Sequence, residues 1–460
     1  MINNTCSAFI PFALLSFATG CGKTETRPNI IFLLTDDHRF DAMGYTGNRY
    51  IKTPNIDRLA NSGIIFENAF VTTSISCASR ASILTGQYAS RHGIIDFSTD
   101  FSDSALLKTY PLILKNRAGY TIGFIGKYGV GLKKHPINHY DYWACEKLTQ
   151  PHYENYDSAG NMIHYTDLIH NRITEFLSRY GDKGPFCLSV SFKAPHVEDS
   201  DPRQFIYNKR YSEYYKDLFY PRPASGNEEQ WNRFSEEFRN NNEARRRWEI
   251  RFKTDSMLHE SVRGYYRLIQ GVDDVVGNLT RKLQEIGIEK NTIIIMAGDN
   301  GFFLGEHGFA GKWFPYEEAV RIPLFIYNPL ENNRFKGYRI RDIALNIDIA
   351  PTILEYAGIE KDPGMQGRPL QQLWRNPRNN PRDFFYYEHR FNHPGLPKSE
   401  AIISLTRKLV NYYELPDSSL EFYDLTTDPG EMNNLINSPL YKEEVPKFMR
   451  MLDSLKLSVR

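Results

Sequence analysis

The chain has 460 residues, with 56 basic against 55 acidic side chains and 41% apolar residues. This near-neutral balance provides no bulk field for nucleic acid or an anionic membrane surface, so any charged ligand must be met by a local patch. The length predicts one large α/β domain followed by a smaller domain.

The N-terminal segment has the pattern of a targeting signal. Residues 8–18 are mostly apolar, and small residues then lead into Cys21 in the sequence ATGC. This run is too short to span a membrane. It favours a bacterial lipoprotein signal over residues 1–21, with an ordinary cleaved signal or a structural N-terminus as the alternatives. We expect a protein of the periplasm or cell surface that meets the membrane only through a lipid on Cys21.

Apolar strands alternate with amphipathic helices along most of the chain. Residues 29–36 form an apolar run that ends in acidic side chains, which is typical of a buried strand with a polar end. Residues 53–63 predict a helix with Thr53 as its cap and Pro54 in its first turn. Further buried strands are predicted at 120–127, 185–192 and 291–298, and a long amphipathic helix at 262–287. This alternation predicts a mostly parallel sheet with helices on both faces.

The pattern changes after about residue 381, where short strands and close turns precede a final helix predicted at 438–456. We therefore expect a large domain over 28–375 and a small α+β domain over 376–460. Residues 197–257 form a charged, aromatic insertion that contains EARRRWEIRFK. Its i,i+4 pairs of opposite charge favour a solvated helix over a basic patch for a polyanionic chain.

Acidic residues follow two of the predicted strands, as Asp36-Asp37 and Asp299-Asn300. The carboxyl ends of parallel strands meet at one edge of a sheet, where ligands bind. Three carboxylates and an amide converging there would repel one another unless neutralised, and a hard divalent cation such as Ca²⁺ or Mg²⁺ suits oxygen ligands. Taken singly, each pair is also an ordinary turn or cap sequence.

Residues 72–93, TTSISCASRASILTGQYASRHG, contain the candidate nucleophiles. Cys77 is the strongest intrinsic nucleophile among them. However, the stretch resembles the signature of the formylglycine-dependent (type I) sulfatases: Cys or Ser, any residue, Pro or Ala, any residue, Arg, then a short helix ending in Thr-Gly. Starting at Ser76 puts Arg80 in the fifth position, whereas starting at Cys77 puts Ala81 there. The register therefore selects Ser76.

The resemblance extends from about Pro28 to about Asn434. It rests on motifs in family order: TPNIDRLANSGIIFENAF, GYTIGFIGKY, APH, AGDNGFFLGEHGFAGKWFPYEEAVRIPLFIY, DIAPTILEYAGI and EFYDLTTDPGEMNNL. It implies an alkaline-phosphatase-like α/β fold, in which a mixed, mostly parallel sheet is sandwiched by helices and a smaller C-terminal α+β domain follows. Residues 28–375 would then be the sulfatase catalytic domain.

The resemblance also implies a chemistry for Ser76. The serine would be oxidised to formylglycine (3-oxoalanine), whose hydrate attacks sulfur through one oxygen and expels sulfate through the other. An unmodified serine would be left as a stable sulfate ester, which is the physical reason for the modification. A serine in this position implies an oxygen-independent, radical-type maturating enzyme as a partner.

The other site residues are likewise implied by the family motifs. The metal, Ca²⁺ with Mg²⁺ as the alternative, would be held by Asp36, Asp37, Ser76, Asp299 and Asn300. The catalytic residues would be Ser76, Arg80, Lys127, His196 and Lys312. The two lysines would neutralise sulfate oxygens, and His196 of APH would protonate the leaving alcohol.

Four further residues are candidates for contacts with the sugar. His307 of GEHG is one candidate. The segment after the first strand of the small domain supplies His389, Arg390 and His393, for which a surface turn is the alternative.

One departure from the family pattern bears on the substrate. Many members have a histidine where this chain has Gly129, in GKYGVG. A similar GKY without histidine is found in the branch that resembles N-acetylglucosamine-6-sulfatases, which favours a sulfated carbohydrate such as a 6-O-sulfated hexosamine. The alternatives are a phosphatase or phosphodiesterase of the same superfamily, with unmodified Ser76 and two zinc ions, and an inactive glycan-binding lipoprotein. Asn300 favours one metal over two.

Overall fold

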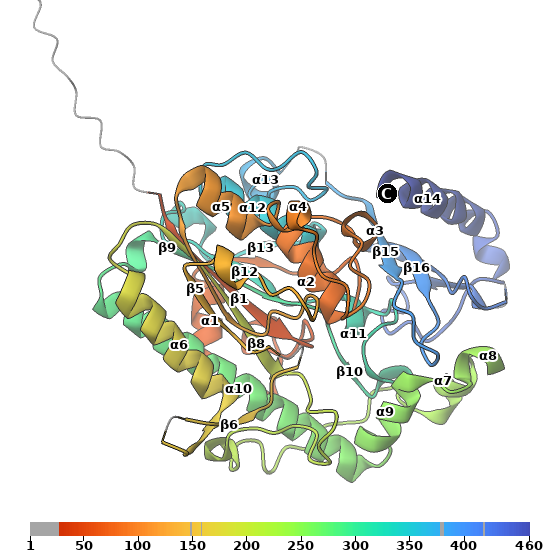
Figure 1. Cartoon of the computed structure of the whole chain (residues 1–460). Helices are drawn as coiled ribbons and strands as arrows, with labels where there is room; N and C mark the ends of the chain where they lie inside the picture. The colour runs from red at the N-terminus through yellow and green to blue at the C-terminus, as the bar shows by residue number, and fades with distance from the viewer. Residues whose placement is uncertain (1–26, 148–149, 158, 378–380, 417–418) are drawn as a thin grey trace, which may run out of the picture.

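The computed structural model describes residues 27–147, 150–157, 159–377, 381–416 and 419–460. Its centre is an eight-stranded sheet in the order β13-β2-β12-β9-β1-β8-β4-β5 (Figure 1). These strands are β13 (Tyr338–Ile340), β2 (Ile64–Phe66), β12 (Leu324–Tyr327), β9 (Thr292–Gly298), β1 (Asn29–Asp36), β8 (Phe186–Pro195), β4 (Thr121–Gly126) and β5 (Tyr142–Cys145). The predicted signal over 1–21, with Cys21, lies outside the described residues and stays a prediction.

The five strands from β9 to β5 are parallel, as the sequence pattern predicts. In the register, Ile31 of β1 lies opposite Ile294 of β9 and Leu188 of β8. β12 runs antiparallel to both β9 and β2, so the sheet is mixed at that edge. Every residue of β1 is buried, because helices cover both faces and leave neither face to water.

Two helical layers enclose the sheet (Figure 1). Because successive side chains of a strand point to opposite faces, Ile31 and Leu33 contact one layer and Ile30 and Phe32 the other. The first layer contains α1 (Pro54–Asn61), α6 (Tyr165–Tyr180) and α10 (Asp255–Glu285), and the second contains α2 (Ser76–Thr85), α5 (Tyr110–Ala118) and α12 (Ile349–Tyr356). α10 begins earlier than predicted, because the Thr254 side chain caps it by accepting from the Met257 amide. Thr53 makes no such side-chain cap on α1.

A four-stranded antiparallel sheet forms the C-terminal part, with α14 (Glu444–Ser458) packed on it (Figure 1). Its strands are β15 (Phe384–His389), β16 (Ser399–Ser404), β17 (Arg407–Asn411) and β18 (Glu421–Asp424). The predicted fold class, a helix-sandwiched mixed sheet with a smaller C-terminal α+β domain, is confirmed. The boundary between residues 375 and 376 stays a prediction.

The insertion after His196 differs from the expectation. Glu243 pairs with Arg247 at 2.7 Å, as its i,i+4 spacing predicts. The expectation of a solvated helix holds for one face only, where Arg246 is 61% exposed, because Trp248 and Arg251 are buried. The helix α9 (Glu243–Arg251) packs against β11 (Ala310–Gly311). Tertiary packing therefore buries one face of a helix whose charge pattern alone indicates exposure.

Short elements complete the described chain. The remaining strands are β3 (Ala69–Phe70), β6 (Glu154–Tyr156), β7 (Met162–His164), β10 (Phe303–Leu304) and β14 (Ala344–Leu345). The remaining α-helices are α3 (Ala89–His92), α4 (Asp103–Leu106), α7 (Glu228–Asn232), α8 (Glu236–Arg239), α11 (Glu317–Val320) and α13 (Gln372–Arg375). The 3-10 helices are η1 (Gly44–Thr46), η2 (Ile137–His139), η3 (Lys209–Tyr211), η4 (Glu289–Asn291), η5 (Glu306–Gly308), η6 (Asn333–Phe335), η7 (Asn346–Asp348) and η9 (Pro439–Tyr441). Within the described ranges, no helix is both long and apolar enough to cross a membrane.

Candidate active site

Four neighbouring strands end at one place, and each delivers a functional side chain there. β1 ends in Asp36, while Asp299, His196 and Lys127 directly follow β9, β8 and β4. All four side chains are buried. The sheet edge therefore assembles carboxylates, a cation and an imidazole from parts of the sequence that are far apart, as expected for the carboxyl ends of parallel strands.

Ser76 opens helix α2 and faces this edge. Its hydroxyl donates to Asp36 Oδ1 at 3.1 Å. The first turn of a helix is the positive end of its dipole, which favours negative charge on an oxygen there. Gly86, with φ of 65°, ends the helix in the left-handed conformation that glycine adopts most readily.

Cys77 turns away from the edge. It is fully buried in the apolar cluster that α2 shares with the C-terminal sheet. Burial raises the pKa of its thiol to about 12, so the thiolate form is suppressed. The geometry therefore agrees with the register that selects Ser76.

Arg80 ties the strand ends together. Its guanidinium donates to Asp299 at 2.9 Å, to Asp36 at 3.2 Å and to the Lys127 carbonyl at 2.8 Å. Gly129 makes room for this side chain, because a Cβ there would lie 2.8 Å from Arg80 Cδ, at a φ of 71°. In this backbone, any side chain at position 129 would therefore collide with Arg80.

Two lysines balance the remaining carboxylate charge. Lys127 forms an ion pair with Asp36. Lys312, which follows β11, contacts both oxygens of Asp37 at 2.6 and 2.8 Å. Burial alone would raise the pKa of Asp36, but Lys127 and the neighbouring cations hold it well below its usual range. Three carboxylates are thus matched by three cations, and all six are buried.

The arrangement around Asn300 fits a hard divalent cation. Its Nδ2 donates to Asp37 Oδ1 at 2.7 Å, whereas its Oδ1 is buried without a hydrogen-bond partner in the part of the chain that the structure describes. Burial raises the pKa of Asp37 to about 6 and also raises that of Asp299. Both carboxylates would therefore gain from further positive charge. An oxygen donor set of this kind suits Ca²⁺ or Mg²⁺.

His196 also lies close to Asp37. Its Nε2 is 3.5 Å from Asp37 Oδ2 and 3.3 Å from the Gln150 amide nitrogen. Its Nδ1 lies 2.6 Å from the Val197 carbonyl, to which it must donate, so Nε2 is the nitrogen that faces the carboxylates. Burial, together with Lys312, lowers the pKa of His196 well below its usual range.

Several residues that shape the site carry no signal in the sequence. The Tyr153 hydroxyl donates to the His196 carbonyl at 2.6 Å, and the Tyr265 hydroxyl donates to the Asp37 carbonyl at 2.7 Å. Ser191 is bonded to Arg80. None of them stands in a motif, and only the folded geometry brings each to the site.

His307 is not brought into contact with the cluster. It is fully buried, stacks on Tyr316 at 4.4 Å between ring centroids, and lies 3.4 Å from an Arg233 nitrogen. These contacts are typical of a packed structural histidine. Its predicted role as a sugar contact gains no support from them.

The three candidates on and after β15 diverge. His389 is fully buried on the strand face that also carries Tyr387, whose hydroxyl donates to the Trp313 carbonyl at 2.6 Å. Arg390 instead lines a separate cavity of about 130 Å³ beside α14. His393 accepts from the Gly395 amide at 3.1 Å within its own turn. The strand face of His389 is thus directed to the segment after Lys312, whereas Arg390 shares its cavity with Ser90 of α3 and Lys456 of α14.

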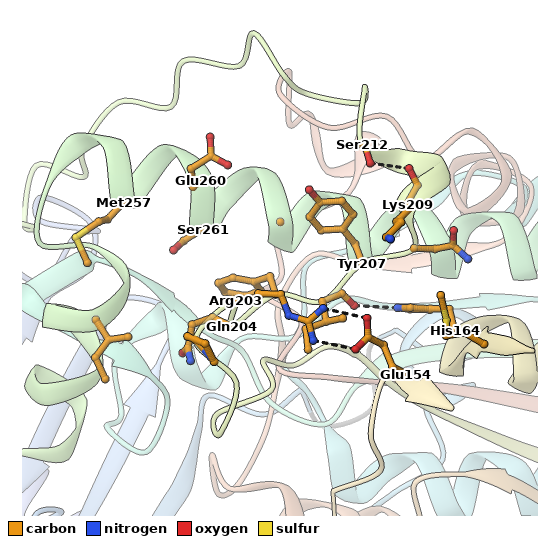
Figure 2. Close-up of a pocket in the computed structure, with 17 residues that line it drawn as sticks. Glu154, His164, Arg203, Gln204, Tyr207, Lys209, Ser212, Met257, Glu260 and Ser261 are labelled. Atoms are coloured by element: carbon orange, nitrogen blue, oxygen red, sulfur yellow. Dashed lines mark hydrogen bonds and ion pairs between the residues drawn. The ribbon is translucent and has the colours of Figure 1, made fainter. Parts of the chain in front are cut away.

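A further cavity of about 560 Å³ lies between α10 and the segment 202–212 (Figure 2). Arg203 and Glu154, which both line it, form a bidentate ion pair at 2.8 and 2.9 Å. None of the carboxylates, lysines or histidine of the strand-end cluster lines this cavity, so the two features are separate.

Comparisons with known proteins are consistent with this geometry. A family model described as Sulfatase matches residues 28–359, and one described as N-sulphoglucosamine sulphohydrolase, C-terminal, matches residues 305–458. The chain is 29% identical to an N-acetylglucosamine-6-O-sulfatase of Bacteroides thetaiotaomicron, across 98% of this chain and 91% of that protein. It is also 29% identical to an arylsulfatase of Clostridium perfringens, across 93% and 94%.

A solved structure that contains its substrate, D-glucosamine-2-N,6-O-disulfate, resembles the whole described fold. It has 29% identity and a TM-score of 0.79, and the match covers 94% of this chain and 98% of that one.

Proposed function

The chain belongs to the sulfatase family and is a sulfuric ester hydrolase, and we propose that it removes the 6-O-sulfate of a glucosamine-type sugar through a formylglycine made from Ser76. The observation that carries the choice of sugar is the near full-length similarity to a 6-O-sulfatase and to a structure holding a 6-O-sulfated glucosamine. The observation that carries the choice of nucleophile is the 3.1 Å contact of Ser76 with Asp36 at the start of α2.

The cations of the strand-end cluster would bind the sulfate group. Lys127 pairs with Asp36, and Lys312 pairs with Asp37. Each ammonium group can direct a further proton toward an entering sulfate oxygen. Arg80 would hold the nucleophilic oxygen and the two strand ends in register. Because all three cations are buried, their charge is little screened and stabilises a transition state that gains negative charge.

His196 would supply the proton for the leaving alcohol. Its Nδ1 is committed to the Val197 carbonyl, so Nε2 is the nitrogen that can give up a proton in the site. Burial and Lys312 disfavour the imidazolium in the free site. An entering sulfate ester brings negative charge beside the ring, which favours the protonated form when the alcohol has to leave.

Asp36, Asp37, Asp299 and Asn300 would hold one divalent cation, which we propose to be Ca²⁺, together with the modified Ser76. When bound, the metal and the aldehyde hydrate supply a nucleophilic oxygen of lowered pKa and a route for releasing sulfate. The unpartnered Asn300 Oδ1 and the raised pKa of Asp37 support such an ion. The charges also agree, since a divalent cation balances one ionised nucleophile and one sulfate monoester.

The partners follow from the same proposal. A serine nucleophile requires a radical-type maturating enzyme. The sequence of residues 1–21 supports export to the periplasm or cell surface with a lipid on Cys21. Cell fractionation tests this anchor, because Cys21→Ala should move the protein from the membrane fraction to the soluble fraction.

The substrate proposal is tested with glucosamine derivatives sulfated at O6, O3 or N, and with galactosamine derivatives sulfated at O4 or O6. Sulfate release measured by ion chromatography should show kcat/KM highest for the 6-O-sulfated glucosamine, by about 10-fold or more over the others. Preferential cleavage at another position would contradict the substrate, and cleavage of phosphate esters in place of sulfate esters would contradict the reaction.

A further inference from the structure

The segment that follows His196 carries a carboxylate whose position the motifs do not explain. Asp199 stands three residues after His196, and its side chain is 40% exposed. Its Oδ1 accepts from Arg247 at 2.9 Å and from Arg251 at 2.6 Å, both on α9. Among the described residues, no side chain donates to its Oδ2. One oxygen is therefore fixed by two arginines, and the other is available to a ligand.

Arg247 is held by one residue of its own helix, Glu243, and by two residues outside it, Trp313 and Asp199. Arg247 Nε donates to Glu243 at 2.7 Å, and the guanidinium lies 5.0 Å from the centroid of the Trp313 ring. Trp313 directly follows Lys312 of the cluster. The Glu243 amide in turn donates to the Gly395 carbonyl at 2.9 Å, which joins α9 to the loop of the C-terminal sheet. The Asp199–Arg247 pair thus stands where the catalytic domain, the insertion and the C-terminal loop meet.

The contacts of this pair lead to both chain segments that supply the leaving-group side of the cluster. Asp199 stands three residues after His196, and Arg247 lies against the ring of Trp313, the residue after Lys312. Burial would raise the pKa of Asp199, but Arg247 and Arg251, which both donate to it, hold the pKa well below its usual range.

We propose that Asp199 and Arg247 form a subsite that binds a free hydroxyl of the sugar whose sulfate enters the cluster. This proposal rests on the proposed function. Asp199 Oδ2 accepts a hydrogen bond from this hydroxyl. The Nη2 group of Arg247, to which no hydrogen bond within the described chain is assigned, donates to the oxygen of the same hydroxyl or of the adjacent one. A carboxylate that stays ionised repels a second sulfate, so this subsite selects sugars that are unsulfated at the position it reads.

Deoxy sugars test the contact directly. The substrates are N-acetylglucosamine 6-sulfate and its 3-deoxy and 4-deoxy forms, with 4-methylumbelliferyl sulfate as a substrate without hydroxyls. In the unaltered enzyme, removing the hydroxyl that is read should lower kcat/KM by about 10- to 100-fold, as for other hydrogen bonds to a charged group. In Asp199→Asn, kcat/KM for the intact sugar should fall by a similar factor, and kcat/KM for the deoxy sugar should fall no further. A residue that merely supports the fold would not cancel the penalty of one particular hydroxyl.

Two further variants keep the test decisive. Arg247→Gln removes the donor and tests the same pair if Asp199→Asn fails to fold. Arg246→Ala is the matched control, because Arg246 is 61% exposed on the same helix and pairs only with Glu243 among the described residues. Its ratio of sugar sulfate to aryl sulfate activity should match that of the unaltered enzyme.

The outcomes separate this proposal from the one on which it rests. If the sugar sulfates are cleaved but each deoxy penalty is the same in Asp199→Asn as in the unaltered enzyme, the subsite is overturned and the sulfatase proposal stands. If no sugar sulfate is cleaved although the aryl sulfate is, the substrate proposal fails and the subsite fails with it.

Discussion

Replacing Ser76 with alanine should abolish sulfate release while leaving the fold intact. The side chain is small, and its hydroxyl makes one hydrogen bond, to Asp36. Its loss removes the nucleophile but opens little space in the core. We expect kcat to fall by about 10⁴-fold or more, as for nucleophiles of other hydrolases. Sulfate release and thermal unfolding, measured on the same preparation, check both halves of this expectation.

Cys77→Ser is the matched control, one residue along the same helix. Because Cys77 is buried in an apolar cluster and the pKa of its thiol is raised, we expect the thiol to take no part in the reaction. The variant should keep its activity within about 3-fold, with a loss of stability of about 1 kcal/mol from burying a hydroxyl in an apolar setting. If Cys77→Ser were inactive while folded, or Ser76→Ala active, the register of the motif would be wrong.

Removing the divalent cation should have the second-largest effect. The carboxylates of Asp37 and Asp299 are buried with raised pKa values, so a chelator should leave them short of positive charge. We expect activity to fall by at least about 10³-fold and to return with Ca²⁺. Calcium at 100 times its dissociation constant should also stabilise the fold by about 2.7 kcal/mol. Activity assays and thermal unfolding, each with and without Ca²⁺, measure the two effects.

Asn300→Leu provides the control for the metal experiment. Leucine has the same branching and number of heavy atoms but lacks the buried Oδ1, so the stabilisation by Ca²⁺ should shrink while the metal-free protein still folds. Metal analysis should find one calcium per chain. Two zinc ions per chain, with activity restored by zinc alone, would instead favour the phosphatase alternative.

The sequence predicts the strand-end cluster well because its signal is local. An apolar run followed by acidic residues marks the ends of β1 and β9, and adjacency in a parallel sheet then brings Asp36 and Asp299 together. Lys127 and His196 directly follow β4 and β8, but in the sequence they are indicated only by their place in the family motifs. The apolar runs indicate that the acidic residues Asp36 and Asp299 stand at strand ends, whereas the order of the strands is known only from the structure.

The remaining features depend on packing between distant segments. Gly129 has no local explanation until Arg80 is seen to fill the space beside it. The charge pattern of α9 indicates exposure, yet Arg251 is buried and donates to Asp199 and Gln204. The candidates of the C-terminal part diverge as well: His389 ends β15 and is fully buried, whereas Arg390 lies just beyond the strand and lines a cavity beside α14. No local pattern in the sequence separates these two neighbours.

The mass of the tryptic peptide 59–80 tests the central claim most directly. This peptide contains both Ser76 and Cys77 and ends at Arg80. When the protein is produced together with a radical maturase, we expect this peptide to be lighter by two hydrogens because Ser76 has become an aldehyde. Fragment ions should place the loss at Ser76, and Cys77 should still react with an alkylating reagent. An unmodified Ser76 in protein that releases sulfate at full rate would contradict the account.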